Sequence, residues 1–419
     1  MWPKKIRFTI MILSFVFLIT LLGNELTENI ISADTVELNL NSVGTGAIME
    51  PGEGKFSYPS NSTVKIKLEP TTEENFIEWL GDSKNIIEQE NGFKINLDSN
   101  KNLTAVFESD NTGFYTKQNQ LFDANDNEFI IRGLSFPYTW FTHQLDTALP
   151  GIKQSGANTV RVVLSSGDHQ TNWGRDSAFE VENIIEKFKE IDIIPVLEVH
   201  DATGYGDDEA AAHISDIVDY WLEIKDVLIG QEDYVIINIA NEPFGNQTKN
   251  DLKEDWINEH QKAIQKLRAG GLKHTLMIDA PNWGQDWQNI MLENADKVYQ
   301  ADPYKNIIFS VHMYEVYGNQ LTVENYFNQF PNDYPLVVGE FGPEHYGDNV
   351  AHEAIMESAD KKDIGYIGWS WKGNSPEEIE VLDMVHDWAG NDLTPWGETL
   401  FKGDYGLQNT AETCSIFKE

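Results

Sequence analysis

Hydrophobic and polar positions follow two different patterns along the chain, one up to residue 109 and another beyond it. The first part contains short alternating runs separated by Gly, Pro, Asn and Ser, which is typical of β-strands with one buried face. These runs are Val36–Leu40, Thr63–Leu68, Phe93–Leu97 and Leu103–Phe107. The pattern predicts a small all-β module over residues 34–109.

From residue 110 to residue 419, short apolar runs alternate with amphipathic stretches. Each run is too short for an isolated helix and is rich in β-branched residues, as buried parallel strands are. The runs are Phe129–Leu134, Thr159–Leu164, Ile193–Val199, Tyr234–Ala240, Thr275–Asp279, Ile307–Val311, Pro335–Glu340 and Ile364–Trp369. Between them, Ile184–Phe188, Ala211–Leu228 and Trp256–Leu267 repeat apolar positions at helical spacing.

Eight strands separated by helices over roughly 300 residues match the size of a (β/α)8 TIM barrel. A doubly wound open sheet is the alternative, but no glycine-rich phosphate-binding sequence follows any of the runs. The predicted fold class is therefore α/β, with a (β/α)8 TIM barrel in residues 110–419 preceded by the small all-β module. We expect the linker near Ser109–Gly113.

The N-terminus has the pattern of a targeting segment. Basic residues up to Arg7 precede the apolar run Phe8–Leu22, and the small pair Ser32-Ala33 offers a cleavage site. We expect residues 1–33 to be a signal peptide and the bacterial protein to be secreted, with no membrane contact after cleavage. A retained membrane anchor is the alternative.

Composition narrows the range of partners. The formal net charge is −38, from 68 acidic and 30 basic residues, so nucleic acid and anionic membranes would be repelled. A neutral polymer would not be repelled, and twelve Trp suit stacking on sugar rings. Cys414, the single cysteine, forms no internal disulfide. No heptad seam is present, and we expect a monomer.

Candidate chemistry lies at the strand ends, because TIM barrel enzymes place their active sites at the C-terminal ends of the strands. Those ends carry Arg161, His200-Asp201, Asn241-Glu242-Pro243, His312, Tyr314, Glu340, Trp369 and Trp371. Glu242 follows the fourth predicted strand and Glu340 ends the seventh, so they face each other across the barrel mouth. Two facing carboxylates suit glycoside hydrolysis, in which one donates a proton and the other attacks the anomeric carbon.

The two acids need different environments. We expect Arg161 and Tyr314 to lower the pKa of Glu340, and partial burial together with the charge of Glu340 to raise the pKa of Glu242. His200 and His312 could tune Glu242, contact sugar hydroxyls, or form a metal site with Asp201 or Glu340. No local metal-ligand pattern of the His-Glu-x-x-His kind occurs, so we expect no metal and no cofactor.

The sequences Asn241-Glu242-Pro243 and Gly339-Glu340-Phe341 resemble the acid/base and nucleophile signatures of glycoside hydrolase family 5, a clan A family. Val199-His200-Asp201, His312-Met313-Tyr314 and Gly368-Trp369-Ser370-Trp371 match in the same order. The resemblance covers residues 114–419. It implies a retaining double displacement with Glu242 as acid/base and Glu340 as nucleophile.

Finer features, including Leu197–Tyr205, Trp371–Asn374 and Leu393–Gly397, resemble the bacterial β-mannanases of subfamily 8 of that family. This resemblance implies an endo-β-1,4-mannanase acting on mannan, galactomannan or glucomannan from plants. It also implies binding roles at the first subsite, a platform beneath the cleaved sugar and an aromatic wall one subsite further out. The implied residues are, for the first subsite, Asn241, Arg161, His200, His312 and Tyr314; for the platform, Trp369; and for the wall, Trp140.

Two parts of the sequence leave alternatives open. Ser135–Phe141 lacks the two histidines of the His-x-His-x-Trp-Tyr sequence usual in relatives, so an endo-β-1,4-glucanase with the same mechanism is the nearest alternative. Phe76–Asp82, with the run ending at Phe107, resembles the divergent internalin-type bacterial repeat. A module of that kind makes a non-catalytic polysaccharide-binding protein the third possibility. We expect Trp79 to belong to the core of this module rather than to bind sugar.

Overall fold

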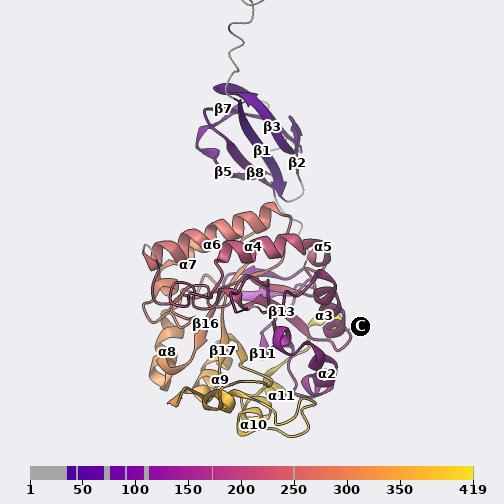
Figure 1. The fold of residues 1–419 in the computed structure, drawn as a ribbon, viewed down its shortest axis with the longest axis vertical. Helices are drawn as coiled ribbons and strands as arrows, with labels where there is room; N and C mark the ends of the chain where they lie inside the picture. The colour runs from indigo at the N-terminus through magenta and orange to yellow at the C-terminus, as the bar shows by residue number, and fades with distance from the viewer. Residues whose placement is uncertain are drawn as a thin grey trace, which may run out of the picture.

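The computed structural model describes residues 35–43, 46–69, 76–89, 92–107, 113–171, 173–248 and 251–418. A closed barrel of eight parallel strands makes up the larger part of the molecule (Figure 1). The prediction of a TIM barrel is confirmed. The barrel strands are β11 (Arg132–Phe136), β12 (Thr159–Leu164), β13 (Ile194–Val199), β14 (Ile236–Asn238), β15 (Leu276–Asp279), β16 (Ile307–Met313), β17 (Leu336–Phe341) and β20 (Gly365–Gly368).

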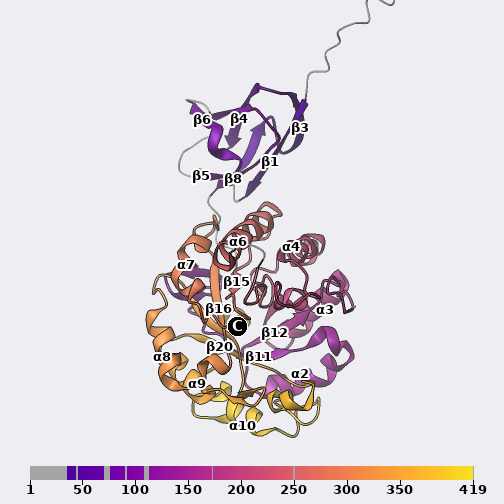
Figure 2. The ribbon, with the colours of Figure 1, turned by 60° about the vertical axis from the view of Figure 1, so that its left-hand side comes forward.

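Helices surround the barrel, as both ribbon views show (Figures 1 and 2). They are α2 (Leu145–Gln154), α3 (Ala178–Lys189), α4 (Ile214–Glu223), α5 (Lys225–Leu228), α6 (Leu252–Ala269), α7 (Ile290–Tyr299), α8 (Gln320–Gln329), α9 (His352–Asp360), α10 (Pro395–Lys402) and α11 (Leu407–Thr410). Their apolar faces and the outward side chains of the strands form one large buried cluster. Because both faces of each strand are covered, the strands are apolar almost throughout.

The barrel interior changes character along its axis. Its lower layers are apolar and include Val196, Met277 and Val337. The hairpin of β9 (Tyr115–Lys117) and β10 (Gln120–Phe122) and the C-terminal tail close this end, where the Cys414 side chain is buried. Two residues further along the strands the interior becomes polar, with Glu198 and Asp279 taking the next inward positions. The polar layer lies directly beneath the rim where the expected site residues are found.

The N-terminal module contains two four-stranded sheets that share an apolar core. Their strand orders are β3-β1-β8-β5 and β2-β4-β7-β6, with β1 and β8 parallel. The strands are β1 (Thr35–Val43), β2 (Ala47–Glu50), β3 (Gly54–Pro59), β4 (Ser62–Glu69), β5 (Phe76–Gly81), β6 (Ile86–Gln89), β7 (Gly92–Leu97) and β8 (Lys101–Phe107). Trp79 packs against Phe76 and Phe93 in this core, as expected.

Several predicted boundaries differ from the structure. Residues 129–131 precede β11 instead of opening it, and β14 is four residues shorter than the predicted run. The predicted helix over 211–228 starts at Ile214 and is broken at Ile224, where α4 ends and α5 begins. The signal peptide and nearly all of the predicted linker lie outside the described residues. Within those residues, every helix is too short or too polar to serve as a membrane span.

Candidate active site

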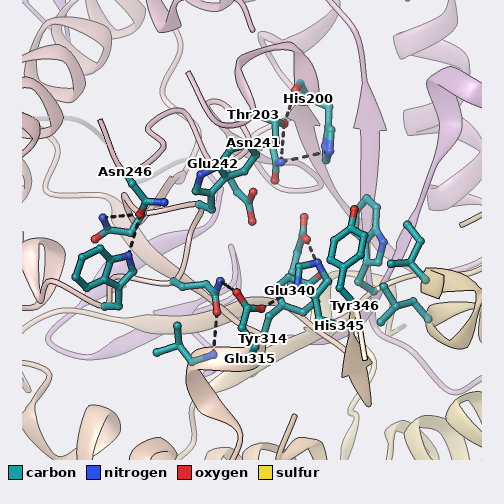
Figure 3. Close-up of a pocket in the computed structure, with 18 residues that line it drawn as sticks. His200, Thr203, Asn241, Glu242, Asn246, Tyr314, Glu315, Glu340, His345 and Tyr346 are labelled. Carbon is teal, nitrogen blue, oxygen red and sulfur yellow. Dashed lines mark hydrogen bonds and ion pairs between the residues drawn. The ribbon is translucent and has the colours of Figure 1, made fainter. Parts of the chain in front are cut away.

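A cleft of about 780 Å³ opens at the C-terminal ends of the barrel strands. Six of the predicted site residues line it: His200, Asn241, Glu242, Tyr314, Glu340 and Trp369. Figure 3 shows the first five of them around one open space. Arg161 and His312 lie directly beneath them and are fully buried. The strand-end prediction therefore located the cleft and its floor.

A β-bulge in β17 aims Glu340 into the cleft. Val338 pairs with Val311 of β16, but Glu340 pairs with the next residue, His312, so Gly339 is extra. An extra residue reverses the inward and outward alternation, and bulges commonly redirect side chains beside active sites. A Cβ on Gly339 would lie 2.1 Å from Ser310 Oγ and 3.0 Å from His312 Nε2, so a larger residue here would displace these side chains or the strand.

Glu242 lies beyond the end of β14 with an unusual backbone conformation. Its φ of +38° falls in the left-handed region, which non-glycine residues rarely adopt. The Glu242 N–H donates to Asp279 Oδ2 at 3.1 Å, and the Glu242 carbonyl accepts from Gly204 N–H at 2.9 Å. Its Oε1 lies 2.7 Å from His312 Nδ1. Main chain and side chain of this residue are thus fixed separately.

The two acids converge. One oxygen of Glu242, one oxygen of Glu340 and a nitrogen of His312 all lie within 4.8 Å of one another. Retaining glycosidases have carboxyl groups about 5–5.5 Å apart, whereas inverting enzymes need roughly 6.5–9.5 Å to admit a water. The observed spacing fits direct attack by one acid while the other supplies the proton.

Arg161 joins the acids to the polar layer of the barrel. Its Nη1 donates to Glu340 Oε1 at 2.5 Å, and its Nη2 donates to Asn241 Oδ1 at 2.7 Å. The same guanidinium lies 3.6 Å from Glu198 and 3.5 Å from Asp279. On the other side, Tyr314 O–H donates to Glu340 Oε2 at 2.9 Å. Two donors from opposite sides therefore fix the Glu340 carboxylate.

The expected net lowering of the Glu340 pKa is wrong. Burial raises its pKa above the ordinary value and outweighs the opposing charges of His312 and Arg161, while the charge of Glu242 adds to the rise. For His312, burial alone would lower the pKa, but the charges of Glu340 and Asp279 raise it to about 10. His312 is therefore a cation beside both acids at neutral pH.

His200 is held between a carboxylate and an aromatic ring. Its Nδ1 lies 2.9 Å from Glu198 Oε1, and its ring stacks on Trp369 with centroids 5.6 Å apart. Trp369 Nε1 donates to Asn374 Oδ1 at 2.8 Å, which fixes the plane of the indole in the cleft wall. Sugar rings stack on a flat, fixed aromatic face of this kind.

Two tryptophans do not line this cleft. Trp140 packs edge-on against His200 with centroids 5.1 Å apart and is not among the lining residues. Trp371 is fully buried, and its Nε1 donates to the carbonyl of Trp388, so it is a core residue. Asp201 is also committed elsewhere, because it accepts three backbone N–H groups from residues 166–169.

Glu242, His312 and Glu340 are the described residues close enough to share a metal ion. A metal needs a free nitrogen lone pair, whereas His312 is held protonated by its carboxylate neighbours. The other proposed partner, Asp201, points into the 166–169 loop. The donor set therefore fits a proton-transfer site better than a metal site.

Sequence reasoning missed several residues of the site. Asp279, Glu198 and Asn238 form the buried layer under the acids. Trp287, half exposed, and Tyr346, mostly exposed, lie at the cleft edge. Asp279 ends a predicted strand run, so the strand-end rule could have found it, whereas nothing in the sequence places Tyr346 at the cleft.

A TIM barrel with convergent carboxylates at the C-terminal ends of the fourth and seventh strands defines the class of barrel glycoside hydrolases. The model for the family described as cellulase, glycosyl hydrolase family 5, matches residues 122–375. The chain belongs to glycoside hydrolase family 5.

Known relatives are similar over most of the barrel. The mannan endo-1,4-β-mannosidase of Cellvibrio japonicus (strain Ueda107) is 48% identical over 316 residues, which cover 75% of this chain and 71% of the relative. The β-mannanase/endoglucanase A of Caldicellulosiruptor saccharolyticus is 46% identical over 296 residues, which cover 68% of this chain and 22% of the relative. The solved mannohexaose complex of Thermomonospora fusca β-mannanase has a TM-score of 0.69 and 47% identity, covering 73% of this chain and 99% of that one.

Proposed function

We propose that the protein is a retaining endo-β-1,4-mannanase that cleaves mannan, galactomannan or glucomannan, with Glu242 as acid/base and Glu340 as nucleophile. The convergence of these two carboxylates within 4.8 Å carries the mechanism. Similarity to the Cellvibrio japonicus mannosidase and to the mannohexaose complex supports the substrate class.

In the first half-reaction, Glu242 donates its proton to the glycosidic oxygen as the C1–O bond breaks. An oxygen of Glu340 attacks the anomeric carbon from the opposite face, and the leaving sugar departs with the proton. Arg161 and Tyr314 hold the attacking carboxylate by one hydrogen bond on each oxygen. His312, at 2.7 Å from Glu242, stabilises the carboxylate that forms there.

In the second half-reaction, the Glu242 carboxylate takes a proton from water. The resulting hydroxyl bonds to the anomeric carbon while the ester bond to Glu340 breaks, so the product keeps the β configuration. Asn241, fixed by Arg161 and by a 2.8 Å bond to Thr203 Oγ1, is placed to donate to a sugar hydroxyl. Trp369 provides the platform for the ring being cleaved.

Glu340→Ala tests the mechanism. Reducing-sugar release from locust bean gum should fall by about 10⁴-fold or more, because the variant lacks the carboxylate that attacks the anomeric carbon. Glu344→Ala is the matched control, since Glu344 follows on the same segment and does not line the cleft. NMR of the first product should show the β-anomer. Undiminished turnover in Glu340→Ala, or an initial α-anomer, would refute the assignment.

An endo-β-1,4-glucanase with the same mechanism is the second candidate, favoured by the similarity to β-mannanase/endoglucanase A. Digestion of locust bean gum and carboxymethyl cellulose side by side separates the two. Cleavage of the cellulose derivative alone would replace the mannanase assignment. Polymer binding by the wild-type protein without any product would instead favour a binding protein.

The domain organisation belongs to the same proposal: a signal peptide in residues 1–33, the all-β module in 34–109, and a catalytic domain in 110–419. Two four-stranded sheets make up the all-β module, and the internalin-repeat type is proposed for it from the resemblance of Phe76–Asp82 and the run ending at Phe107. The basic and apolar N-terminus supports secretion, and a monomer is expected because the sequence has no heptad seam. N-terminal sequencing of protein recovered from culture medium tests this, and an intact Met1 there would refute cleavage.

A further inference from the structure

Asp279 has no part in the double displacement described above, yet it touches the supports of both acids. It ends β15, is fully buried, and does not line the cleft. Since it cannot contact a sugar, any contribution must pass through neighbouring residues. Its contacts show that this contribution reaches Glu242.

The first link runs to the main chain of Glu242. Asp279 Oδ2 accepts the Glu242 N–H at 3.1 Å, at the residue whose φ is +38°. A non-glycine residue keeps such a conformation only when its surroundings hold it there. The bond to Asp279 therefore helps to determine the direction in which the Glu242 side chain leaves the backbone.

The second link runs through His312 to the carboxyl group of Glu242. His312 Nε2 lies 3.4 Å from Asp279 Oδ2, as a charge contact, and His312 Nδ1 lies 2.7 Å from Glu242 Oε1. The imidazole ring is thus held between the two carboxyl groups. Asp279 itself is fixed because its Oδ1 accepts from Asn238 Nδ2 at 3.0 Å.

We propose that Asp279 is the positioning residue that aims the Glu242 proton donor at the glycosidic oxygen, an inference that rests on the proposed function. Both of its oxygens accept: Oδ1 from Asn238, and Oδ2 from the Glu242 N–H and, at 3.5 Å, from Arg161 Nη2. Asparagine has a single acceptor oxygen, so it would turn an N–H₂ group toward one of these donors. Asp279→Asn should therefore loosen Glu242 with almost no change in side-chain volume.

Leaving-group dependence isolates this role. Mannohexaose has a sugar leaving group that needs protonation, whereas the leaving group of 2,4-dinitrophenyl β-mannobioside departs without it. We expect Asp279→Asn to lower kcat/KM on mannohexaose by about 100-fold and on the activated substrate by less than about 5-fold. Equal losses on the two substrates, or no loss on mannohexaose, would overturn the proposal.

Asp302→Asn is the matched control, because Asp302 is equally buried and forms a two-bond ion pair with Arg268 away from the cleft. Asp302→Asn should lower the melting temperature, and any loss of kcat/KM should be equal on the two substrates. If Asp279→Asn does not fold, Asn238→Ala tests the same support. It should lower kcat/KM on mannohexaose about 10-fold more than kcat/KM on the activated substrate. No split in that variant would overturn the proposal. Hydrolysis of mannan by Glu340→Ala is a separate result, which would refute the proposed function itself.

Discussion

Replacing Arg161 with methionine removes the one permanent cation of the buried layer. The guanidinium is fully buried, and its Nε donates to Asn238 Oδ1 at 2.9 Å, in addition to its bonds to Asn241 and Glu340. Methionine fills a similar volume without charge. Glu198, Asp279 and Glu340 would then lose the guanidinium that lies within 3.6 Å of each of them.

The expected cost follows from that geometry. Removing one partner of a buried ion pair destabilises a protein by about 3–5 kcal/mol, because the remaining charge is left uncompensated. Three carboxylates share this guanidinium, so we expect a value near 5 kcal/mol at neutral pH. Arg161 also opposes the rise in the Glu340 pKa that burial causes. Without it, the pKa of Glu340 in the folded state rises further.

The sign of the pH dependence follows from that rise. A carboxyl group with a raised folded-state pKa binds its proton more tightly in the folded protein, so stability is lost as pH increases through that range. The loss of unfolding free energy in Arg161→Met, relative to the wild type, should therefore grow from about pH 4 upward and shrink on acidification. The acid limb of the kcat/KM profile should also move to higher pH, because the nucleophile Glu340 loses its proton at a higher pH.

Urea unfolding at pH 5 and pH 7, followed by tryptophan fluorescence, measures the first effect, and initial rates on mannohexaose across pH measure the second. Arg161→Lys is the control: it keeps the charge but loses the forked set of donors, so its acid limb should move less. An Arg161→Met variant as stable as the wild type at pH 7, or one with an unmoved acid limb, would refute this account of the charge layer.

Three further predictions concern individual residues. Gly339→Ala should abolish most activity by displacing β16 or β17, since the added Cβ would overlap Ser310 Oγ; wild-type kcat/KM would contradict the bulge argument. Burial raises the pKa of Cys414 to about 12, so Ellman's reagent should leave the native protein unmodified and react after addition of guanidinium chloride; rapid native labelling would disprove this. Burial lowers the pKa of His274 to about 3, so stability should fall as pH drops from 6.5, and His274→Leu should flatten that part of the curve; an unchanged slope would exclude His274 as its cause.

The barrel could be predicted because each strand is a short apolar run bounded by turn residues. All eight runs became barrel strands, and Thr159–Leu164 has the predicted bounds. What the runs could not show is register. The bulge at Gly339 depends on how β17 pairs with β16, and periodicity within one strand carries no information about a neighbour. The inward direction of Glu340 therefore required the structure.

The candidate site shows the same division between residue type and geometry. Glu242 and Glu340 could be found from the sequence because charged residues at apolar strand ends are unusual, and Arg161 because it interrupts the apolar run Thr159–Leu164. Asp279 occupies such an end too, but its importance lies in accepting from Asn238 and from the Glu242 N–H, contacts that only the closed barrel brings together. Trp140 packs against His200 and is not among the residues that line the cleft, so its role as an aromatic wall one subsite further out stays a prediction.

The charge layer also explains why two similar acids take different roles. Burial lowers the pKa of His200, but the charge and hydrogen bond of Glu198 raise it overall. Arg161 and His312 then face Asp279, Glu340 and Glu242, two cations against three acids. Arg161 bonds directly to the side chain of Glu340, whereas Asp279 accepts from the main-chain N–H of Glu242. The guanidinium therefore fixes the carboxylate of the nucleophile, and Asp279 fixes the backbone that carries the proton donor.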